Sequence, residues 1–288
     1  MSDTSFRLAV VKLGCIGAAP LADLILDERA DRDDIAVRGF TSGAKLDPES
    51  CEGPVADALR WQPQLALVVS PNAALPGPGK ARELLAAAGV PFIAIGDSPS
   101  KKAFYVKNEA GKQVPDARPG QGFVVLPFDP MIGARRELLD PTEMALFNAD
   151  VIRLLAATGA LRAIQNELDR VIAAIKAGAA PVLPALTLEP EQAVEAGGFA
   201  NPYAAAKALA ALKIAEAVAG VTTRGCFMEK EPARYIPQVA AGHEMMRTAA
   251  ALADAARELE KSIDTVLRTP HSGAGETRRK TRLLDKPA

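Results

Sequence analysis

The sequence is poor in the residues from which metal and redox sites are usually built. Its only cysteines are Cys15, Cys51 and Cys226, which are odd in number and lie too far apart for a CxxC pair. This usage predicts reduced thiols rather than a disulfide framework or a structural zinc site. The only histidines, His243 and His271, form no HxxxH motif. We therefore predict no metal, and we interpret each histidine as a lone capping or packing side chain, with His243 at a helix start.

Long apolar runs and an excess of one charge are also missing. No stretch reaches the roughly 18 apolar residues of a membrane-spanning helix, and the first residues lack the pattern of a secretion signal. Lysine and arginine number 34 and aspartate and glutamate 35, so the net charge is −1. This balance offers no general attraction to nucleic acid or to an anionic membrane. We expect a cytoplasmic protein that binds neither.

Several common catalytic motifs are absent as well. The chain contains no G-x-S-x-G and no G-x-x-x-x-G-K-[ST], which argues against the usual hydrolase and P-loop routes. Its composition is otherwise ordinary, with 49% hydrophobic and 24% charged residues. A chain of this length and composition can bury a sizeable core in one large domain or two modest ones.

Residues 1–140 alternate short apolar runs with helical stretches. The predicted strands are Leu8–Leu13, Ile35–Thr41, Leu65–Ser70, Phe92–Ile95 and Phe123–Leu126. The predicted helices are Ala18–Arg29, Pro48–Arg60 and Gly79–Ala88, and Asp47 is a suitable N-cap for the second. This alternation predicts an α/β domain with a doubly wound, mainly parallel sheet.

Residues 141–288 are mostly helical and predict a second domain, a helical bundle with a small β element. The predicted helices are Pro141–Thr158, Leu161–Lys176, Pro202–Ala219 and His243–Leu267. The last has a heptad-like apolar seam that favours packing against another helix. Ala179–Gly198 reads as a connector, and Val221–Met228 as one strand of the small β element. The polar tail after Thr269 is expected to be an extended arm or disordered.

Ligands bind at the carboxyl ends of the strands in sheets of this kind, so the loops there are candidate sites. The first, Gly14–Gly17, lets a ligand approach the backbone and offers an anion the free N–H groups of a helix start. It lacks the full G-x-G-x-x-G fingerprint, so a tight structural turn is an equal interpretation. The second, Ser70–Gly79, holds three prolines and two glycines. Asn72 in this loop could bind a planar heterocycle, or the loop is only a stiff connection.

Two further loops carry charged side chains. After the fourth strand, Asp97 could accept hydrogen bonds from a pterin or flavin-like ring, or only cap a turn. Lys101 and Lys102 next to it suit either an anionic tail or solvent. After the fifth strand come Arg135 and Arg136, and paired guanidinium groups suit phosphate or carboxylate recognition. The alternative for these arginines is an ion pair with a nearby acidic residue.

Taken together, these stretches resemble one enzyme family over nearly the whole chain. The matching segments are Lys12–Gly17, Leu26–Arg32, Ser70–Pro78, Ile95–Asp97, Met131–Glu137, Leu138–Gly159, Phe199–Tyr203, Gly225–Phe227, His243–Arg247 and Glu258–His271. The sequence is similar to the coenzyme F420-dependent methylene-tetrahydromethanopterin dehydrogenases of methanogenic archaea. So many long matches in the same order are specific for the family and its fold.

The resemblance implies reversible hydride transfer between the methylene carbon of a reduced pterin and coenzyme F420, a deazaflavin, in a homohexamer built from dimers. The carrier supplies the reactivity, so no residue is expected to act as acid or base. Asp97 is expected to stabilise the cationic methenyl product electrostatically. The expected coenzyme-binding residues are Gly14, Ile16, Gly17, Ser70, Pro71, Asn72 and Asp97. The expected substrate-binding residues are Met131, Arg135 and Arg136.

Two segments differ from the archaeal pattern. Residues 101–121 look longer and different, and Asn72-Ala73-Ala74 stands where Asn-Pro-Ala is expected. Both lie near the proposed ligand loops, so they bear on the identity of the hydride acceptor. The alternatives are a pterin dehydrogenase of the same family that uses NADP or a flavin, and a pterin-binding protein without turnover.

Overall fold

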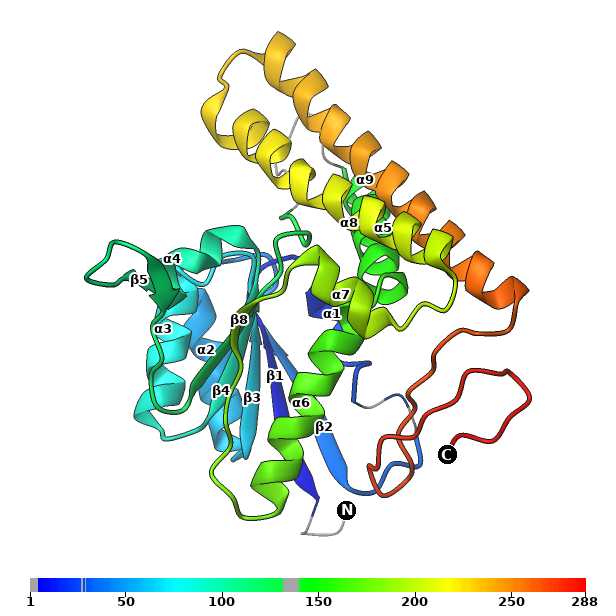
Figure 1. The fold of residues 1–288 in the computed structure, drawn as a ribbon. Helices are drawn as coiled ribbons and strands as arrows, with labels where there is room; N and C mark the ends of the chain where they lie inside the picture. The colour runs from blue at the N-terminus through cyan, green and yellow to red at the C-terminus, as the bar shows by residue number, and fades with distance from the viewer. Residues whose placement is uncertain (1–4, 27, 29, 132–139) are drawn as a thin grey trace. The chain divides into compact units, whose positions relative to one another are not determined.

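The structure is a computed structural model that describes residues 5–26, 28, 30–131 and 140–288 (Figure 1). The chain divides into two compact units, and each is assembled from three stretches of sequence. The α/β unit contains Met1–Leu126, Ile164–Thr187 and Thr269–Arg278. The helical unit contains Pro127–Ala163, Leu188–Arg268 and Arg279–Ala288.

The α/β unit is built on a six-stranded sheet in which all neighbouring strands are parallel. In spatial order the strands are β2 (Ile35–Thr41), β1 (Phe6–Lys12), β3 (Leu65–Val69), β4 (Phe92–Gly96), β7 (Gln121–Val125) and β8 (Ala185–Thr187). The predicted α/β class is confirmed, and each of the five predicted strands overlaps a strand of the sheet. The short β8 escaped prediction because it lies in the segment that reads as a connector.

Helices cover both faces of the sheet. In Figure 1, α2 (Pro48–Arg60) and α3 (Pro76–Ala87) lie on one face, and α6 (Ala160–Lys176) crosses the other from Ile164 onward. The Asp47 carboxylate accepts a hydrogen bond of 2.9 Å from the backbone N–H of Ser50, which confirms the predicted N-cap. Three shorter elements of this unit are α1 (Ala18–Leu21), η1 (Ser98–Ser100) and α4 (Lys101–Phe104). The prediction of a helix over Ala18–Arg29 was therefore too long.

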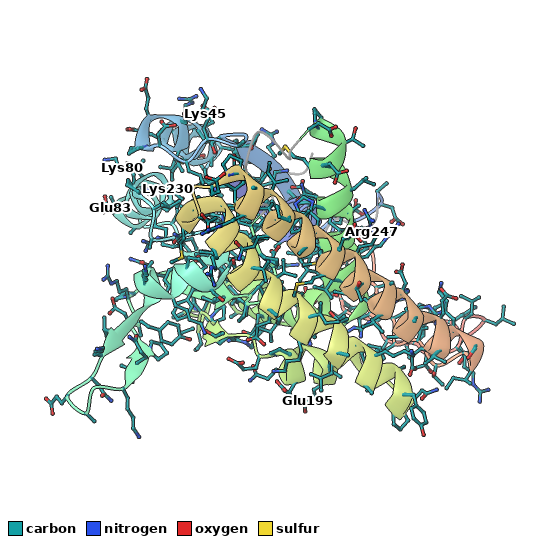
Figure 2. All side chains as sticks on the ribbon, turned by 90° about the horizontal axis from the view of Figure 1, so that it is seen from above. Lys45, Lys80, Glu83, Glu195, Lys230 and Arg247 are labelled. Carbon is teal, nitrogen blue, oxygen red and sulfur yellow. The ribbon has the colours of Figure 1, made fainter. Side chains whose placement is uncertain are left out.

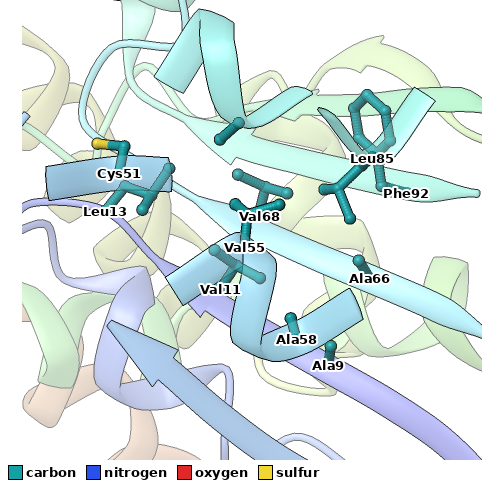
Figure 3. Close-up of a cluster of buried hydrophobic side chains, with 11 residues drawn as sticks. Ala9, Val11, Leu13, Cys51, Val55, Ala58, Ala66, Val68, Leu85 and Phe92 are labelled. Carbon is teal, nitrogen blue, oxygen red and sulfur yellow. The ribbon is translucent and has the colours of Figure 1, made fainter. Parts of the chain in front are cut away.

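The core between the sheet and α2 and α3 follows from the alternation of side chains along a strand. Val11 on β1 points toward Val55 on α2, and Leu85 on α3 joins the same cluster (Figure 3). Each large apolar side chain buried in this way contributes about 1.5–3 kcal/mol. On the outer surface of the unit, the charged side chains of Lys45 and Glu83 project into solvent (Figure 2). This packing fixes the strand ends from which the candidate loops begin.

A small hairpin occupies the segment that differs from the archaeal pattern. Its strands, β5 (Tyr105–Lys107) and β6 (Gln113–Pro115), are antiparallel. The ring of Phe123 on β7 stacks on Phe104 at 4.6 Å and meets Tyr105 edge-on at 5.4 Å. The Tyr105 hydroxyl also lies 3.0 Å from Thr187 Oγ1 on β8. Aromatic packing and this hydrogen bond hold the base of the hairpin against the sheet.

The helical unit consists mainly of four helices and the first turn of α6. They are α5 (Pro141–Ala157), α7 (Pro190–Gly197), α8 (Pro202–Thr223) and α9 (Pro232–Ser262). The long helices α8 and α9 lie side by side (Figure 1). Ala204 and Ala208 on α8 are buried with Ala256 on α9, and such small side chains let two helices approach closely.

The predicted strand over Val221–Met228 is wrong. Helix α8 continues to Thr223 and passes into a π-helical turn, η2 (Arg224–Met228). The buried Thr222 donates a 3.1 Å hydrogen bond to the Val218 carbonyl oxygen, one turn earlier in the helix. Packing against α9 therefore outweighs the strand preference of the β-branched residues.

Helix α9 also differs from its predicted limits. It begins at Pro232 rather than at His243 and ends at Ser262 rather than at Leu267, with Pro237 in its interior. The interpretation of His243 as a helix start is therefore wrong. Beyond the helix the tail folds back, and the backbones of Arg268 and Lys280 exchange hydrogen bonds of 2.8 and 3.0 Å.

No single described helix has both the length and the apolar composition of a membrane span. Helices α5 and α6 meet both requirements only together, as a bent pair.

Candidate functional site

Three of the candidate loops meet at the carboxyl edge of the sheet. Strands β1, β3 and β4 are successive neighbours, so the loops that follow them start side by side. The backbone N–H of Leu13 donates to the Val69 carbonyl oxygen (2.8 Å), and that of Ser70 donates to the Ile95 carbonyl oxygen (3.0 Å). The structure thus brings together seven residues singled out in the sequence. They are Gly14, Ile16, Gly17, Ser70, Pro71, Asn72 and Asp97.

The loop after β1 depends on a glycine at its first position. Gly14 has φ +77°, and a Cβ there would lie 2.9 Å from Leu46 Cδ2 and 3.2 Å from Pro71 Cδ. A side chain would strain the backbone and push the second loop away. Helix α1 behind Gly17 has only four residues, too few to build up the dipole of a long helix. A ligand at this loop would therefore meet backbone at Gly14 and Gly17, beside the buried Ile16.

The loop after β3 is held by its own side chains. The buried Ser70 accepts a hydrogen bond from the Asn72 backbone N–H at 3.3 Å. The Asn72 side-chain oxygen accepts from the Ala74 backbone N–H at 3.0 Å. This Asx turn uses the acceptor side of the Asn72 amide. The half-buried Asn72 is thus set to offer its amide N–H groups to a ligand.

Asp97 directly follows β4 and is buried, with 3% of its surface exposed. Its Oδ1 accepts a 2.5 Å hydrogen bond from the Ser98 backbone N–H and so caps η1. Capping was one of the two interpretations of this residue, and it is confirmed. Capping fixes the carboxyl group at the edge of the sheet, and its electrostatic role stays a prediction.

The fourth loop begins where β7 ends. The backbone N–H of Leu126 donates to the Gly96 carbonyl oxygen at 2.8 Å, and the next residue, Pro127, begins the helical unit. There Asp129 is fully buried and Met131 is half-buried. The predicted Arg135 and Arg136 lie outside the described residues.

This set of loops can be compared with known proteins. Residues 6–288 match the family model described as methylene-5,6,7,8-tetrahydromethanopterin dehydrogenase. The chain belongs to this dehydrogenase family. It is 56% identical over 282 residues to the F420-dependent methylenetetrahydromethanopterin dehydrogenase of Archaeoglobus fulgidus, with 98% of each chain covered. It is 51% identical over 281 residues to that of Methanothermobacter marburgensis, with 98% of this chain and 99% of the other covered.

A solved structure extends this similarity to three dimensions. An F420-dependent methylene-tetrahydromethanopterin dehydrogenase in complex with methylene-tetrahydromethanopterin and coenzyme F420 matches with a TM-score of 0.90 at 44% identity. The match covers 99% of this chain and 100% of that one. The family predicted from the sequence is therefore confirmed.

In this member of the dehydrogenase family, the sequence interpretation missed a buried ionic cluster around His271. The side chain of His271 is fully buried, with Nδ1 2.8 Å from Glu28 Oε1 and Nε2 2.8 Å from Asp169 Oδ1. Burial alone would lower the pKa of His271, but the hydrogen bonds and charges of Asp169 and Glu28 outweigh it and raise that pKa. The interpretation of His271 as a lone side chain is wrong. Its partners are too distant in sequence for any spacing to reveal them.

The His271 cluster lies away from the carboxyl edge. It borders a pocket of about 380 Å³ that also includes Asp34, whose carbonyl oxygen accepts from the backbone N–H of Phe6 at the start of β1 (2.9 Å). This places the pocket toward the amino end of the strands. Both ring nitrogens of His271 are engaged by carboxylates, and no group in the described part of the chain has the arrangement of a metal site.

His243 has a different environment, inside the helical unit. It is buried on α9 against the ring of Phe147 at 4.7 Å, and its Nδ1 lies 3.7 Å from Glu143 Oε2. Burial lowers the pKa of His243 and outweighs the opposing effect of Glu143. The packing role predicted for it is thus supported, although its position in the helix is not the predicted one.

Proposed function

We propose that this chain transfers a hydride reversibly between methylene-tetrahydromethanopterin and coenzyme F420. The observation that carries the proposal is the match over essentially the full length of both chains with the structure of a dehydrogenase solved with both of these molecules. The activity printed for the relatives of Archaeoglobus and Methanothermobacter agrees with it. It makes the chain an oxidoreductase of one-carbon metabolism.

The carboxyl edge of the sheet suits the coenzyme chemically. A deazaflavin ring carries both N–H and carbonyl groups, and the edge offers the amide of Asn72 and the carboxylate of Asp97 on adjacent strand ends. When bound, F420 supplies the ring carbon that accepts or returns the hydride. We assign its binding to Gly14, Ile16, Gly17, Ser70, Pro71, Asn72 and Asp97.

The residues of this edge position the coenzyme and the pterin and stabilise the charge that forms on the pterin. They need not move a proton. Hydride transfer from the methylene group leaves a methenyl cation, which a nearby carboxylate stabilises. Asp97 is assigned this role because it is buried and fixed by its hydrogen bond to Ser98. Met131, Arg135 and Arg136 are assigned to the pterin, where guanidinium groups suit anionic substituents.

An activity assay tests the proposal directly. Purified protein mixed with methylene-tetrahydromethanopterin and oxidised F420 is expected to remove the visible absorption of the deazaflavin, and the reverse mixture to restore it. NADP and a free flavin serve as parallel acceptors. Turnover with one of these but not with F420 would refute the coenzyme assignment. Pterin binding without turnover in the presence of any of the acceptors would refute the proposal that the chain is an enzyme.

The same proposal includes a cytoplasmic homo-oligomer. The family resemblance implies that this oligomer is a hexamer. Cys15, Cys51 and Cys226 form no disulfide among the described residues, which suits a reducing compartment. Large apolar side chains are exposed in the helical unit, including Tyr203 at 78%, Phe227 at 64% and Met228 at 71%, as is common where subunits meet. Sedimentation velocity would measure the oligomer, and a monomer at assay concentration would contradict it.

A further inference from the structure

Ser100 connects the two loops that flank the proposed coenzyme site, although nothing in the sequence singled it out. Its side chain is fully buried at the end of η1. Its Oγ accepts a 2.9 Å hydrogen bond from the backbone N–H of Ala73, in the loop after β3. Its own backbone N–H donates to the Asp97 carbonyl oxygen at 2.8 Å. One residue thus holds the Asn72 loop and the Asp97 turn together.

Gly96 leaves the space that this connection needs. A Cβ on Gly96 would collide with Ser100 Oγ and would lie 2.7 Å from the carbonyl oxygen of Ser70. The hydroxyl therefore sits directly over the glycine backbone at the end of β4, with the Ser70 carbonyl beside it. Gly96 and the Ser70 carbonyl leave the Ser100 hydroxyl little room to move. A shift of Ser100 would therefore also shift Ala73, whose N–H it accepts.

We propose that Ser100 is a positioning residue for F420, one that fixes the separation between Asn72 and Asp97. The proposal rests on the function proposed above. Ser100 itself is buried beneath the loops and acts through the Ala73 N–H, next to the Asn72 side chain. Without the hydroxyl, the Ala73 N–H loses its acceptor in a buried place, which is costly enough to make the loop reorient. The distance between the Asn72 amide and Asp97 then changes, and the amide no longer faces the coenzyme.

The test compares Ser100→Ala with a matched control, Ser272→Ala. Ser272 is also a buried serine of the α/β unit, and its Oγ accepts a backbone N–H, that of Glu276, at 3.1 Å. For Ser100→Ala, the KM and the dissociation constant for F420 are expected to rise about tenfold, with kcat within about twofold of the wild type. For Ser272→Ala, both constants are expected to stay at the wild-type values.

Hydrogen exchange supplies a readout that does not depend on activity. The Ala73 amide is expected to exchange faster in Ser100→Ala and unchanged in Ser272→Ala. Ser100→Cys replaces the hydroxyl by a somewhat larger thiol that is still a weak acceptor, so its F420 affinity is expected between those of the wild type and Ser100→Ala.

The outcomes separate this inference from the proposed function. Faster exchange at Ala73 with unchanged F420 constants would make Ser100 merely structural and overturn the inference alone. An equal rise of the F420 constants in Ser100→Ala and Ser272→Ala would also overturn it, because the effect would then follow general destabilisation. A wild-type chain that neither binds nor reduces F420 would overturn the proposed function, and the inference with it.

Discussion

Asp97 places a buried carboxyl group at the carboxyl edge of the sheet. Asp97 accepts the Ser98 N–H through one oxygen and lies at the end of a fully buried strand. A charge in such a place acts through a lower effective dielectric than it would in water. The role proposed for Asp97 depends on this effect, because a buried carboxylate favours a nearby cation more strongly than an exposed one does.

Replacing Asp97 by asparagine should separate charge from structure. The amide oxygen can still accept the Ser98 N–H, so the turn is expected to persist while the negative charge is lost. In the reverse reaction, the KM for the methenyl cation is expected to rise about tenfold, measured in steady-state assays with reduced F420. Asp116→Asn, which removes a carboxylate from an exposed ion pair with Arg118, is the control. An unchanged KM in Asp97→Asn would exclude the electrostatic role.

The sequence identifies a single site residue only where its role follows from its immediate neighbours in the chain. Gly14, Asn72 and Asp97 could be picked out because each follows an apolar run that ends at a strand boundary. Ser100 could not, because its partner Ala73 lies in another loop. His271 could not either, because it meets carboxylates from two other segments of the chain only after folding.

At the scale of elements, the His271 cluster fastens the segment Thr269–Arg278 to the rest of the α/β unit. Besides the two ring contacts, the His271 backbone N–H donates to Glu28 Oε1 at 2.7 Å. Thr277 Oγ1 lies 2.9 Å from Asp169 Oδ2, and Gln165 donates to the Thr269 carbonyl oxygen at 2.9 Å. The imidazole of His271 lies at the centre of these hydrogen bonds. Its protonation therefore affects how strongly the segment Thr269–Arg278 is bound to the rest of the unit.

The stability of the chain is expected to fall as the pH rises above about 6.5, the ordinary histidine pKa. Because the pKa of His271 is raised in the folded chain, the proton binds more tightly to the folded state than to the unfolded one. The stabilisation is therefore complete below the unfolded pKa and disappears as the pH rises through the folded value. Urea unfolding between pH 6 and pH 9 would measure it. The charge of Arg32 opposes the proton on His271 and lowers this pKa.

Two variants make the pH test specific. His271→Gln is expected to cost about 3 kcal/mol at pH 6, because the partner carboxylates stay partly buried, and less at pH 9. The control, His243→Gln, removes a histidine whose pKa is lowered by burial, so its cost should grow as the pH rises toward about 6.5 and stay level above it. A cost for His271→Gln that is independent of pH would contradict the charged state of the imidazole.

Helices and strands could be predicted where the apolar pattern of the sequence and the packing in the fold favour the same conformation. The strands β3 and β4 are apolar throughout because both faces are covered. Val221–Met228 has the residues of a strand, but the long contact between α8 and α9 keeps it helical. The β5–β6 hairpin lacks an apolar run of its own and depends on Phe123, which belongs to another strand.

At the scale of the whole molecule, the C-terminal residues belong to two different units. Thr269–Arg278 is part of the α/β unit, whereas Arg279–Ala288 is part of the helical unit. Ending the chain after Arg268 is expected to destabilise the α/β unit, because Glu28, Asp169 and Gln165 lose their partners. Hydrogen exchange of the β1 and β2 peptides would report the loss.

A chain that ends after Arg278 is the control for this truncation. It keeps His271 and Thr277 and removes only the last stretch, so the exchange of β1 and β2 is expected to match that of the full chain. Equal exchange in all three chains would show that the His271 contacts add nothing to the stability of the sheet.

The assembly of the α/β unit from three distant stretches has a consequence for how the protein is made. Synthesis on the ribosome proceeds from the N-terminus, so the sheet strands β1, β2, β3, β4 and β7 emerge long before β8 and the segment with His271. Until then, β7 presents an unpaired edge, and one face of the sheet lacks α6. The α/β unit therefore cannot complete its fold before Thr269–Arg278 has been synthesised, and a chaperone that shields this edge until then would help the nascent chain.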